Sequence, residues 1–171
     1  GRLTYQKAYD ILLRAFSIVV KNIPEWNLVV IGKGELEVEL KNLADDLGIS
    51  NNISWIGEVN DPYQYYQKAS IFSLASRYEG TSNAMLEAMS IGIPVIVSST
   101  SSGCLEYVEN EITGLVFANE DYESLAQSIL RLIQDFSLSR RLGEAGREKV
   151  KENEISKVIN KWEQVLGLVN H

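Results

Sequence analysis

Residues 77–97 read RYEGTSNAMLEAMSIGIPVIV, and this stretch decides the class of fold. A turn of small residues, Gly80–Asn83, opens a helix, which then runs into the apolar, proline-led strand Pro94–Val97. Two carboxylates, Glu79 and Glu87, flank the start of the helix with seven residues between them. A helix N-terminus offers unpaired N–H groups and the positive end of the helix dipole, which suit a phosphate. Because ionised carboxylates accept hydrogen bonds from hydroxyls, the stretch indicates a nucleotide-sugar site.

The same alternation of helical spacing and short apolar runs recurs along the first two thirds of the chain. Each run is β-branched or aromatic and apolar on both faces, as expected of a buried parallel strand. Asp61 and Pro62 read as an N-cap and a first helical residue, so a helix is predicted from Pro62 to about Ala69. This order predicts an α/β fold, a Rossmann-like doubly wound parallel sheet over residues 1–118. The predicted strands are Leu28–Ile31, Ile53–Ile56, Ile71–Leu74, Pro94–Val97 and Leu115–Phe117.

After Phe117 the apolar runs stop and helical spacing takes over. We predict three helices, Asp121–Asp135, Ser137–Val150 and Ile155–Leu168, whose role is packing rather than chemistry. They form a helical tail, residues 119–171, on a single nucleotide-sugar-binding domain of residues 1–171. The opening Gly-Arg-Leu reads as the loop that leaves a strand, so we expect an excised part of a longer protein. A targeting sequence could then lie in the missing part.

Composition and charge exclude several classes of protein. The chain has 171 residues, of which 45% are apolar, enough for one good-sized core. Its net charge of −7 and the lack of a basic stripe argue against nucleic-acid binding, and no apolar run approaches the roughly 20 residues of a membrane span. The single cysteine, Cys104, excludes an internal disulfide and makes the cytoplasm the default location. The sequence contains a single histidine, the terminal His171, and no Asp-x-Asp motif. We therefore expect neither a metal site nor another cofactor.

Two cations at the start of the chain are candidates for binding a diphosphate. Arg2 and Lys7 bracket the start of the first helix, and the loops at the carboxyl ends of parallel strands converge on one crevice. A terminal arginine and a solvated lysine are an equally good interpretation from spacing alone. Glu87 lies about 7 Å along its helix, comparable with the distance from a diphosphate to the far edge of a ribose. Its neighbours are mostly apolar, so we expect a largely buried helix and a carboxylate that needs a partner.

Three glycine turns are further candidates, with weaker support. Gly32 belongs to a Gly-Lys-Gly turn that lacks the third glycine of the dinucleotide fingerprint, which favours a plain strand-to-helix turn. The Gly57–Val59 loop could border a base, although a simple turn explains it better. Backbone amides at Gly103–Leu105 could face a sugar or a phosphate. Cys104 has no cationic neighbour or partner histidine in the sequence, so we interpret its thiol as inert.

These motifs resemble the C-terminal, donor-binding domain of retaining GT-B glycosyltransferases, specifically glycosyltransferase family 4 (group 1). The resemblance covers nearly the whole chain, and its most specific part is the pair of acids with Glu-Ala-Met and Gly-x-Pro-Val. Two departures stand out: Ala8 replaces a glycine after Lys7, and Thr81-Ser82 replaces the common bulky residue and proline. The matching segments are Gly1–Leu3, Val30–Glu35, Ile53–Gly57, Ser76–Gly80, Leu86–Met89, Gly92–Ile96, Gly103–Glu106 and Thr113–Phe117.

The resemblance implies roles for individual residues. Arg2 and Lys7 would bind the donor diphosphate and stabilise the leaving group, Glu79 would hold the sugar hydroxyls, and Glu87 the ribose hydroxyls. It also implies transfer with retention at the anomeric carbon and without a required metal, so that catalysis rests on positioning and on charge stabilisation. The remaining implied donor contacts are Gly32, Gly57, Val59, Gly80, Thr81, Ser82, Asn83, Gly103, Cys104 and Leu105.

The expected reaction is transfer of a hexose or N-acetylhexosamine from a nucleotide-diphospho-sugar, with UDP as the expected nucleotide. An asparagine at position 83 resembles the pattern of family members that act on bacterial surface polysaccharides. The resemblance therefore implies a glycan or a lipid-linked glycan as the acceptor. The family's N-terminal acceptor domain is not in this chain, and we expect the domain alone to be inactive. The full-length enzyme could then associate with the inner face of the membrane. Alternatives are a non-catalytic nucleotide-sugar-binding module, a GT-B-like epimerase and a phosphorylase. A phosphorylase should need a buried lysine that binds its cofactor, and Lys7 is poorly placed for that role.

Overall fold

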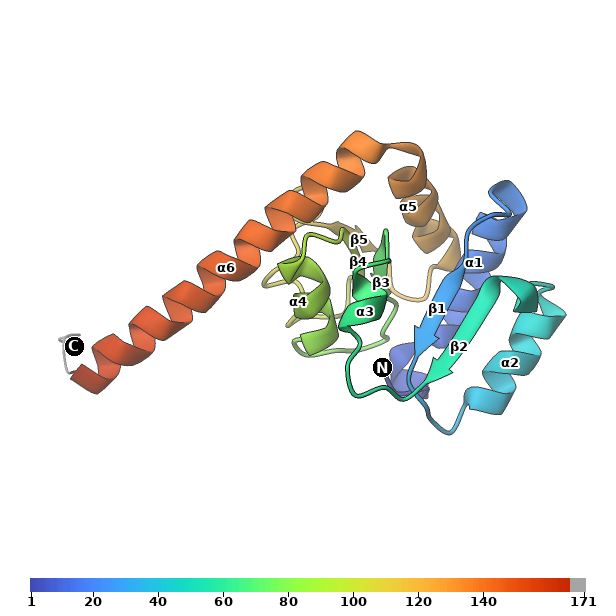
Figure 1. Ribbon diagram of the computed structural model, residues 1–171, viewed down its shortest axis with the longest axis horizontal. Helices are drawn as coiled ribbons and strands as arrows, with labels where there is room; N and C mark the ends of the chain where they lie inside the picture. The colour runs from blue at the N-terminus through green and yellow to red at the C-terminus, as the bar shows by residue number, and fades with distance from the viewer. Residues whose placement is uncertain (167–171) are drawn as a thin grey trace.

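The computed structural model describes the backbone of residues 1–166 and the side chains of residues 1–153 (Figure 1). Short apolar runs form strands where the sequence predicts them, each within one residue of the predicted ends. Two of the runs, residues 28–31 and 115–117, match without any shift. The strands are β1 (Leu28–Ile31), β2 (Ile53–Gly57), β3 (Phe72–Leu74), β4 (Val95–Ser98) and β5 (Leu115–Phe117).

Helices fill the segments between and after the strands, and two short 3₁₀ turns, η1 (Tyr5–Lys7) and η2 (Ser50–Asn52), precede α1 and β2. In Figure 1 the last helix starts beside α5 and extends well beyond the rest of the molecule. No helix of the described part combines the length and the apolar character needed to cross a membrane. The helices are α1 (Tyr9–Asn22), α2 (Glu37–Asp46), α3 (Tyr63–Tyr66), α4 (Asn83–Ser90), α5 (Tyr122–Gln134) and α6 (Phe136–Leu166).

All strand pairs are parallel, which confirms the predicted α/β class. The strands do not form one continuous sheet, however. β1 pairs with β2 in a two-stranded sheet, and β3, β4 and β5 pair in that order in a three-stranded sheet. The sequence pattern identifies the strands but contains no information on this separation.

Strand β4 shows that helices cover both faces of its sheet. Ile96 packs into a core formed with α1 and α5, whereas Val95 and Val97 pack into a second core with α4. Because successive side chains of a strand point to opposite faces, the two cores lie on opposite sides of β4. All four residues of β4 are buried. This is the doubly wound arrangement that the alternation of elements predicts.

Two predictions about helices are wrong in detail. Residues 136–166 form one helix rather than two, since the polar segment that separates the predicted helices contains neither proline nor glycine to end one. The predicted end at Leu168 lies outside the described residues, as does His171. Helix α3 covers only four residues, and its N-cap is Pro62 rather than the predicted Asp61. Asp61 lies in the turn before the helix, where its side chain accepts a hydrogen bond from the Tyr63 N–H at 2.9 Å.

Candidate functional site

The turn before α4 opens the helix as the sequence predicts. Ser82 is the N-cap, and its Oγ accepts a hydrogen bond from the Met85 N–H at 3.4 Å. The helix turns Met85, Ala88 and Met89 into the core, which fixes its rotation. The first backbone N–H groups of α4, beginning at Asn83, therefore lie at the carboxyl edge of the three-stranded sheet, where ligands bind in open α/β folds.

Lys7 and Glu79 form an ion pair, although 72 residues separate them in sequence. Lys7 ends η1, and Glu79 lies in the loop between β3 and α4. Their side chains are only 21% and 12% exposed. The Ser76 hydroxyl also donates to Oε2 of Glu79, at 3.2 Å. Both contacts use the same oxygen, so Oε1 of Glu79 has no hydrogen-bond partner among the described residues and can accept one from a ligand.

Arg77 fastens these two loops together, and the sequence analysis assigned it no role. Its guanidinium makes a bidentate pair with Asp10, at 3.0 and 2.7 Å, and donates to Glu120 at 2.6 Å. It also donates to the Tyr5 carbonyl at 2.8 Å and lies over the Tyr5 ring. The hydrogen bonds to Asp10 raise the pKa of Arg77 above its usual value, so it stays charged. The backbone N–H of Arg77 donates to the Gln6 carbonyl at 2.9 Å, beside Lys7.

The side chain of Glu87 is exposed, which contradicts the predicted burial of this carboxylate. Apolar neighbours in sequence suggested a buried helix, but the buried face of α4 excludes position 87. The carboxylate does have a partner, because the Tyr66 hydroxyl donates to its Oε2 at 3.1 Å. Burial, with the negative charge of Glu87 as a further cause, raises the pKa of Tyr66. The phenol therefore remains a donor, and its ring packs edge-on against Phe72 of β3.

The Gly103 turn packs against the Gly80–Thr81 segment. A Cβ on Gly103 would lie 2.5 Å from the Thr81 nitrogen, so only glycine permits this approach. The Cys104 thiol is buried and donates to the Gly80 carbonyl at 3.2 Å. Burial raises the pKa of Cys104, in keeping with the predicted inert thiol. Leu105, in contrast, is exposed.

The backbone conformations of two other small residues, Gly32 and Ala8, explain which residue types fit at these positions. Gly32 has φ 136°, and a Cβ there would meet the Gly1 carbonyl oxygen at 1.8 Å, which supports the interpretation as a plain packing turn. Ala8 has φ 50°, in the left-handed region that favours glycine, and its methyl group is fully buried. A non-glycine residue in this conformation costs about 1–2 kcal/mol. The glycine that the family resemblance implies after Lys7 would adopt it without strain.

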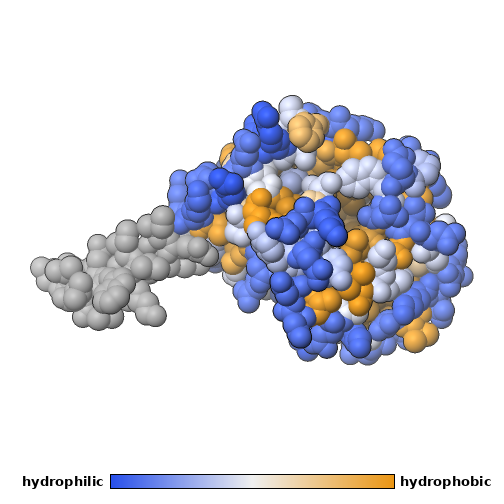
Figure 2. Space-filling view, viewed as in Figure 1, coloured by the Kyte–Doolittle hydropathy of each residue, from blue (hydrophilic) through white to orange (hydrophobic). Residues whose placement is uncertain are grey.

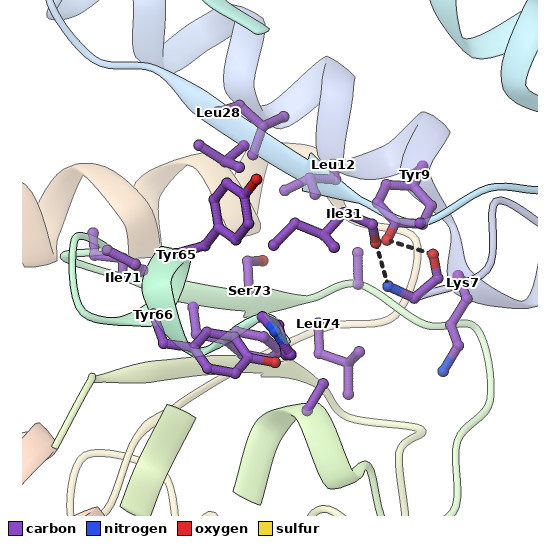
Figure 3. Close-up of a pocket in the computed structure, with 18 of the residues that line it drawn as sticks. Lys7, Tyr9, Leu12, Leu28, Ile31, Tyr65, Tyr66, Ile71, Ser73 and Leu74 are labelled. Carbon is purple, nitrogen blue, oxygen red and sulfur yellow. Dashed lines mark hydrogen bonds between the residues drawn. The ribbon is translucent and has the colours of Figure 1, made fainter. Parts of the chain in front are cut away.

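The structure brings part of the predicted set to one cavity of about 940 Å³. The other predicted residues do not line this cavity. Among them, Glu79 is paired with Lys7, and the Gly103 turn is packed on Gly80–Thr81. Figure 3 shows the Lys7 end of the cavity, with Tyr65 and Tyr66 of α3 opposite. The predicted residues that line the cavity are Arg2, Lys7, Gly32, Val59, Ser82 and Glu87.

No group of three or more potential metal ligands occurs within the described part of the chain. The residues that the sequence analysis missed are Arg77 and Tyr66. Arg77 lies in the stretch of residues 77–97, close to the end of a predicted strand. Its position there is the one local feature of the sequence that could have indicated a role. Tyr66 belongs to a run of tyrosines on a short helix, and nothing in that run indicates which hydroxyl meets Glu87.

Comparison with known proteins identifies relatives over nearly the whole chain. The family model described as "Glycosyl transferases group 1" matches residues 1–149. An uncharacterized glycosyltransferase of Haemophilus influenzae is 32% identical over 97% of the chain and 47% of its own length. The capsular polysaccharide biosynthesis glycosyltransferase CapM of Staphylococcus aureus is 30% identical, over 99% of the chain and 44% of its own length. The chain thus spans about half the length of these curated relatives.

Solved structures share the fold. The C-terminal domain of a glycosyl transferase group 1 family protein (LpcC) from Francisella tularensis superposes with a TM-score of 0.81, at 24% identity, over 89% of this chain and 82% of that one. Anabaena HepE, in complex with UDP, superposes with a TM-score of 0.82 at 20% identity, over 94% of this chain and 47% of that one.

Proposed function

Because the chain belongs to the group 1 glycosyltransferases, we propose that it is the donor-binding domain of a retaining enzyme. The enzyme transfers a hexose or an N-acetylhexosamine from a UDP-sugar to a glycan or lipid-linked acceptor. The observation that carries the proposal is the Lys7–Glu79 ion pair beside the start of α4, with Glu87 at the same cavity. This arrangement sets cations, helix N–H groups and two hydroxyl acceptors at one edge of the sheet.

The diphosphate would lie between Arg2, Lys7 and the N-terminus of α4. In the free protein Glu79 neutralises Lys7, so Arg2 and the helix N–H groups supply the remaining positive potential. As the bond to the sugar breaks, negative charge grows on the diphosphate. Fixed cations that already face this charge need not reorganise, which lowers the barrier without a metal ion.

The two carboxylates would hold the two sugars of the donor. Oε1 of Glu79 is available for a hydroxyl of the transferred sugar, while Lys7 and Ser76 fix the orientation of the carboxylate through Oε2. The Tyr66 hydroxyl bonds only one oxygen of Glu87 and leaves the other for the ribose. The Gly57–Val59 loop, part of which lines the cavity, would border the base.

The acceptor and its binding groups belong to the rest of the full-length enzyme in this proposal. Surface polysaccharide synthesis is supported by the relative CapM, whose name assigns it to capsular polysaccharide biosynthesis. A cytoplasmic enzyme at the inner face of the membrane would meet both a soluble UDP-sugar and a lipid-linked acceptor. We expect residues 1–171 alone to bind the nucleotide weakly and to transfer nothing.

Calorimetry on the full-length protein with UDP, GDP and ADP tests the proposal. We expect UDP to bind at millimolar concentration or below, with no requirement for a divalent metal. The substitution Glu87→Gln should weaken UDP binding, because it replaces the carboxylate that would accept from the ribose. Its matched control is Glu123→Gln, which changes an exposed glutamate on α5 and should leave affinity unchanged.

Absence of binding for all three nucleotides would overturn the proposal. Isomerisation of a UDP-sugar without acceptor would establish an epimerase instead. Retention is checked by the anomeric configuration of the product in NMR.

A further inference from the structure

Lys33 is a cation of the cavity that has no place in the donor site described so far. It comes directly after Gly32 at the end of β1, and the Gly57–Val59 loop begins at the last residue of β2, the strand that pairs with β1. The Gly32 N–H donates to the Gly57 carbonyl at 2.7 Å, so the two loops are in contact. Because the strands are parallel, both loops lie at their carboxyl ends, where ligands of open α/β sheets bind.

The side chain of Lys33 lies across Gly57. A Cβ on Gly57, which has φ 78°, would be 3.3 Å from Cε of Lys33, closer than ordinary van der Waals contact. The glycine therefore leaves room for the methylene stem of Lys33 at the end of β2. Lysine side chains typically pack their stem on the protein and keep the charged head group in water. The ammonium, one bond beyond Cε, is thus held beside the Gly57–Val59 loop.

This ammonium is available to a ligand. Within residues 1–153, Lys33 forms no ion pair. Glu37 is bonded to Lys41 at 2.6 Å, and this bond is the main reason for the lowered pKa of Glu37, to which Lys33 contributes least. Glu58 also lines the cavity, without such a contact to Lys33. The N–H donors of the ammonium can therefore all be used by a ligand.

A group that only donates distinguishes nucleotide bases by the edge that they present. Uracil and guanine carry a keto oxygen, which accepts a hydrogen bond, whereas cytosine and adenine carry an amino group at the corresponding place, which donates one. A lysine ammonium has donors and no acceptor. It therefore matches a keto oxygen, and against an amino group it leaves two donors facing one another.

The surroundings of Lys33 also fit a base, which has apolar faces and a polar edge. Ile31 and Val59 line the cavity on either side of it in sequence and supply apolar contact. On the face of the molecule drawn in Figure 2, hydrophobic residues lie at the surface among hydrophilic ones. Small-molecule sites typically have this character, with a mostly apolar lining and a few polar groups that fix the orientation of the ligand.

We propose that Lys33 selects the base of the nucleotide-sugar. Its ammonium donates to the keto oxygen of uracil or guanine, and it disfavours cytosine and adenine. The inference rests on the proposed function, which places the base at the Gly57–Val59 loop. It adds the side chain of this chain that enforces the choice of base.

A phosphate contact is the competing role for a lysine in this position. The proposed diphosphate site lies at the start of α4, which follows β3, whereas Lys33 packs on the end of β2 in the other sheet. A phosphate contact is the same for every nucleoside diphosphate, so it would strengthen the binding of UDP and CDP equally. A base contact changes the ratio of their affinities. Measurement of this ratio therefore separates the two roles.

Calorimetry on the full-length protein with UDP and CDP, which differ only in the base, tests the inference. We expect the wild type to bind UDP at least about tenfold more tightly than CDP, because hydrogen bonds to charged groups are the stronger ones. Lys33→Met should weaken UDP binding and reduce the ratio of the two dissociation constants to less than about threefold. Lys33→Glu should lower the ratio further, because a carboxylate accepts from the amino group of cytosine.

The matched control is Lys41→Met, which removes the same charge from a side chain that does not line the cavity. It should leave both affinities unchanged, and the exposed position of Lys33 should leave the unfolding midpoint of Lys33→Met unchanged as well. An unchanged UDP-to-CDP ratio in Lys33→Met, or equal affinities in the wild type, would overturn the inference and leave the proposed function intact. Failure of the wild type to bind either nucleotide would overturn the proposed function and this inference with it.

Discussion

Glu79 and Glu87 lie in one short stretch of sequence, yet the structure treats the two ends of this stretch in opposite ways. Glu79 is 12% exposed and is held by Lys7 and Ser76. Glu87 is exposed and has a single partner, the Tyr66 hydroxyl. The Glu79 end is thus organised before any donor arrives, while the Glu87 end remains open to solvent. Organisation is most useful where charge develops in the reaction, and openness where a ligand must enter.

Arg77 lies close to only one of these two ends, in the loop that carries Glu79. Its contacts join η1, the first turn of α1 and the loop before α5 to the loop that carries Glu79. Among the described side chains, Glu87 is held only by the hydroxyl of Tyr66, which lies on the four-residue helix α3. Four substitutions test the contrast, in order of decreasing expected effect.

Lys7→Ala should have the largest effect. It removes a cation that faces the proposed diphosphate, and loss of one such group typically costs about 10²–10³-fold in turnover. The measurement is kcat with a UDP-sugar in the full-length enzyme, with Lys7→Arg as the charge-preserving control. A fall of less than about tenfold in Lys7→Ala would show that the ion pair with Glu79 is only structural.

Arg77→Lys should come next, because it keeps the charge but loses the fork that meets Asp10 through two nitrogens. With the guanidinium 11% exposed, we expect the free energy of unfolding to fall by about 2 kcal/mol, measured by urea denaturation. The matched control is Arg131→Lys, whose pair with Glu111 is exposed on the surface and which should leave the unfolding midpoint almost unchanged. Equal shifts in the two variants would remove Arg77 from its role as the cross-link.

Glu87→Gln should weaken UDP binding by about tenfold, since a neutral amide is a poorer acceptor for ribose hydroxyls than a carboxylate. Calorimetry should show this loss with stability unchanged, because Glu87 is exposed and forms no ion pair with any residue whose side chain is described. If Glu87→Gln destabilised the protein as much as Arg77→Lys does, the open and organised ends would not differ as described.

Tyr66→Phe should have the smallest effect, a two- to fivefold loss of UDP affinity from about 0.5–1 kcal/mol of lost hydrogen bonding to Glu87. The raised pKa of Tyr66 keeps the hydroxyl protonated in alkaline solution. Wild-type affinity should therefore show no fall from ionisation of this tyrosine up to about pH 10, its ordinary pKa. The raised pKa of Tyr66 would be contradicted if wild-type UDP affinity fell below pH 10 and the same fall were absent in Tyr66→Phe.

Local pattern was enough to predict the strands and the start of α4, because short-range periodicity and capping determine both. Side-chain partners could not be predicted in this way. The partners of Arg77 lie 67 and 43 residues away in sequence, at Asp10 and Glu120. Exposure of Glu87 depends on which face of α4 meets the core, which its immediate neighbours do not reveal. The separation into two sheets depends on strand pairing, which is equally non-local.

The unpaired edges of β1 and β3 also bear on how this polypeptide behaves at high concentration. An unpaired edge is a template for a strand from another molecule, and here two such edges face one another across an apolar space. Preparations of residues 1–171 alone should thus self-associate through borrowed strands as they are concentrated. Unpaired strand edges thus affect the colloidal behaviour of this domain as well as its fold.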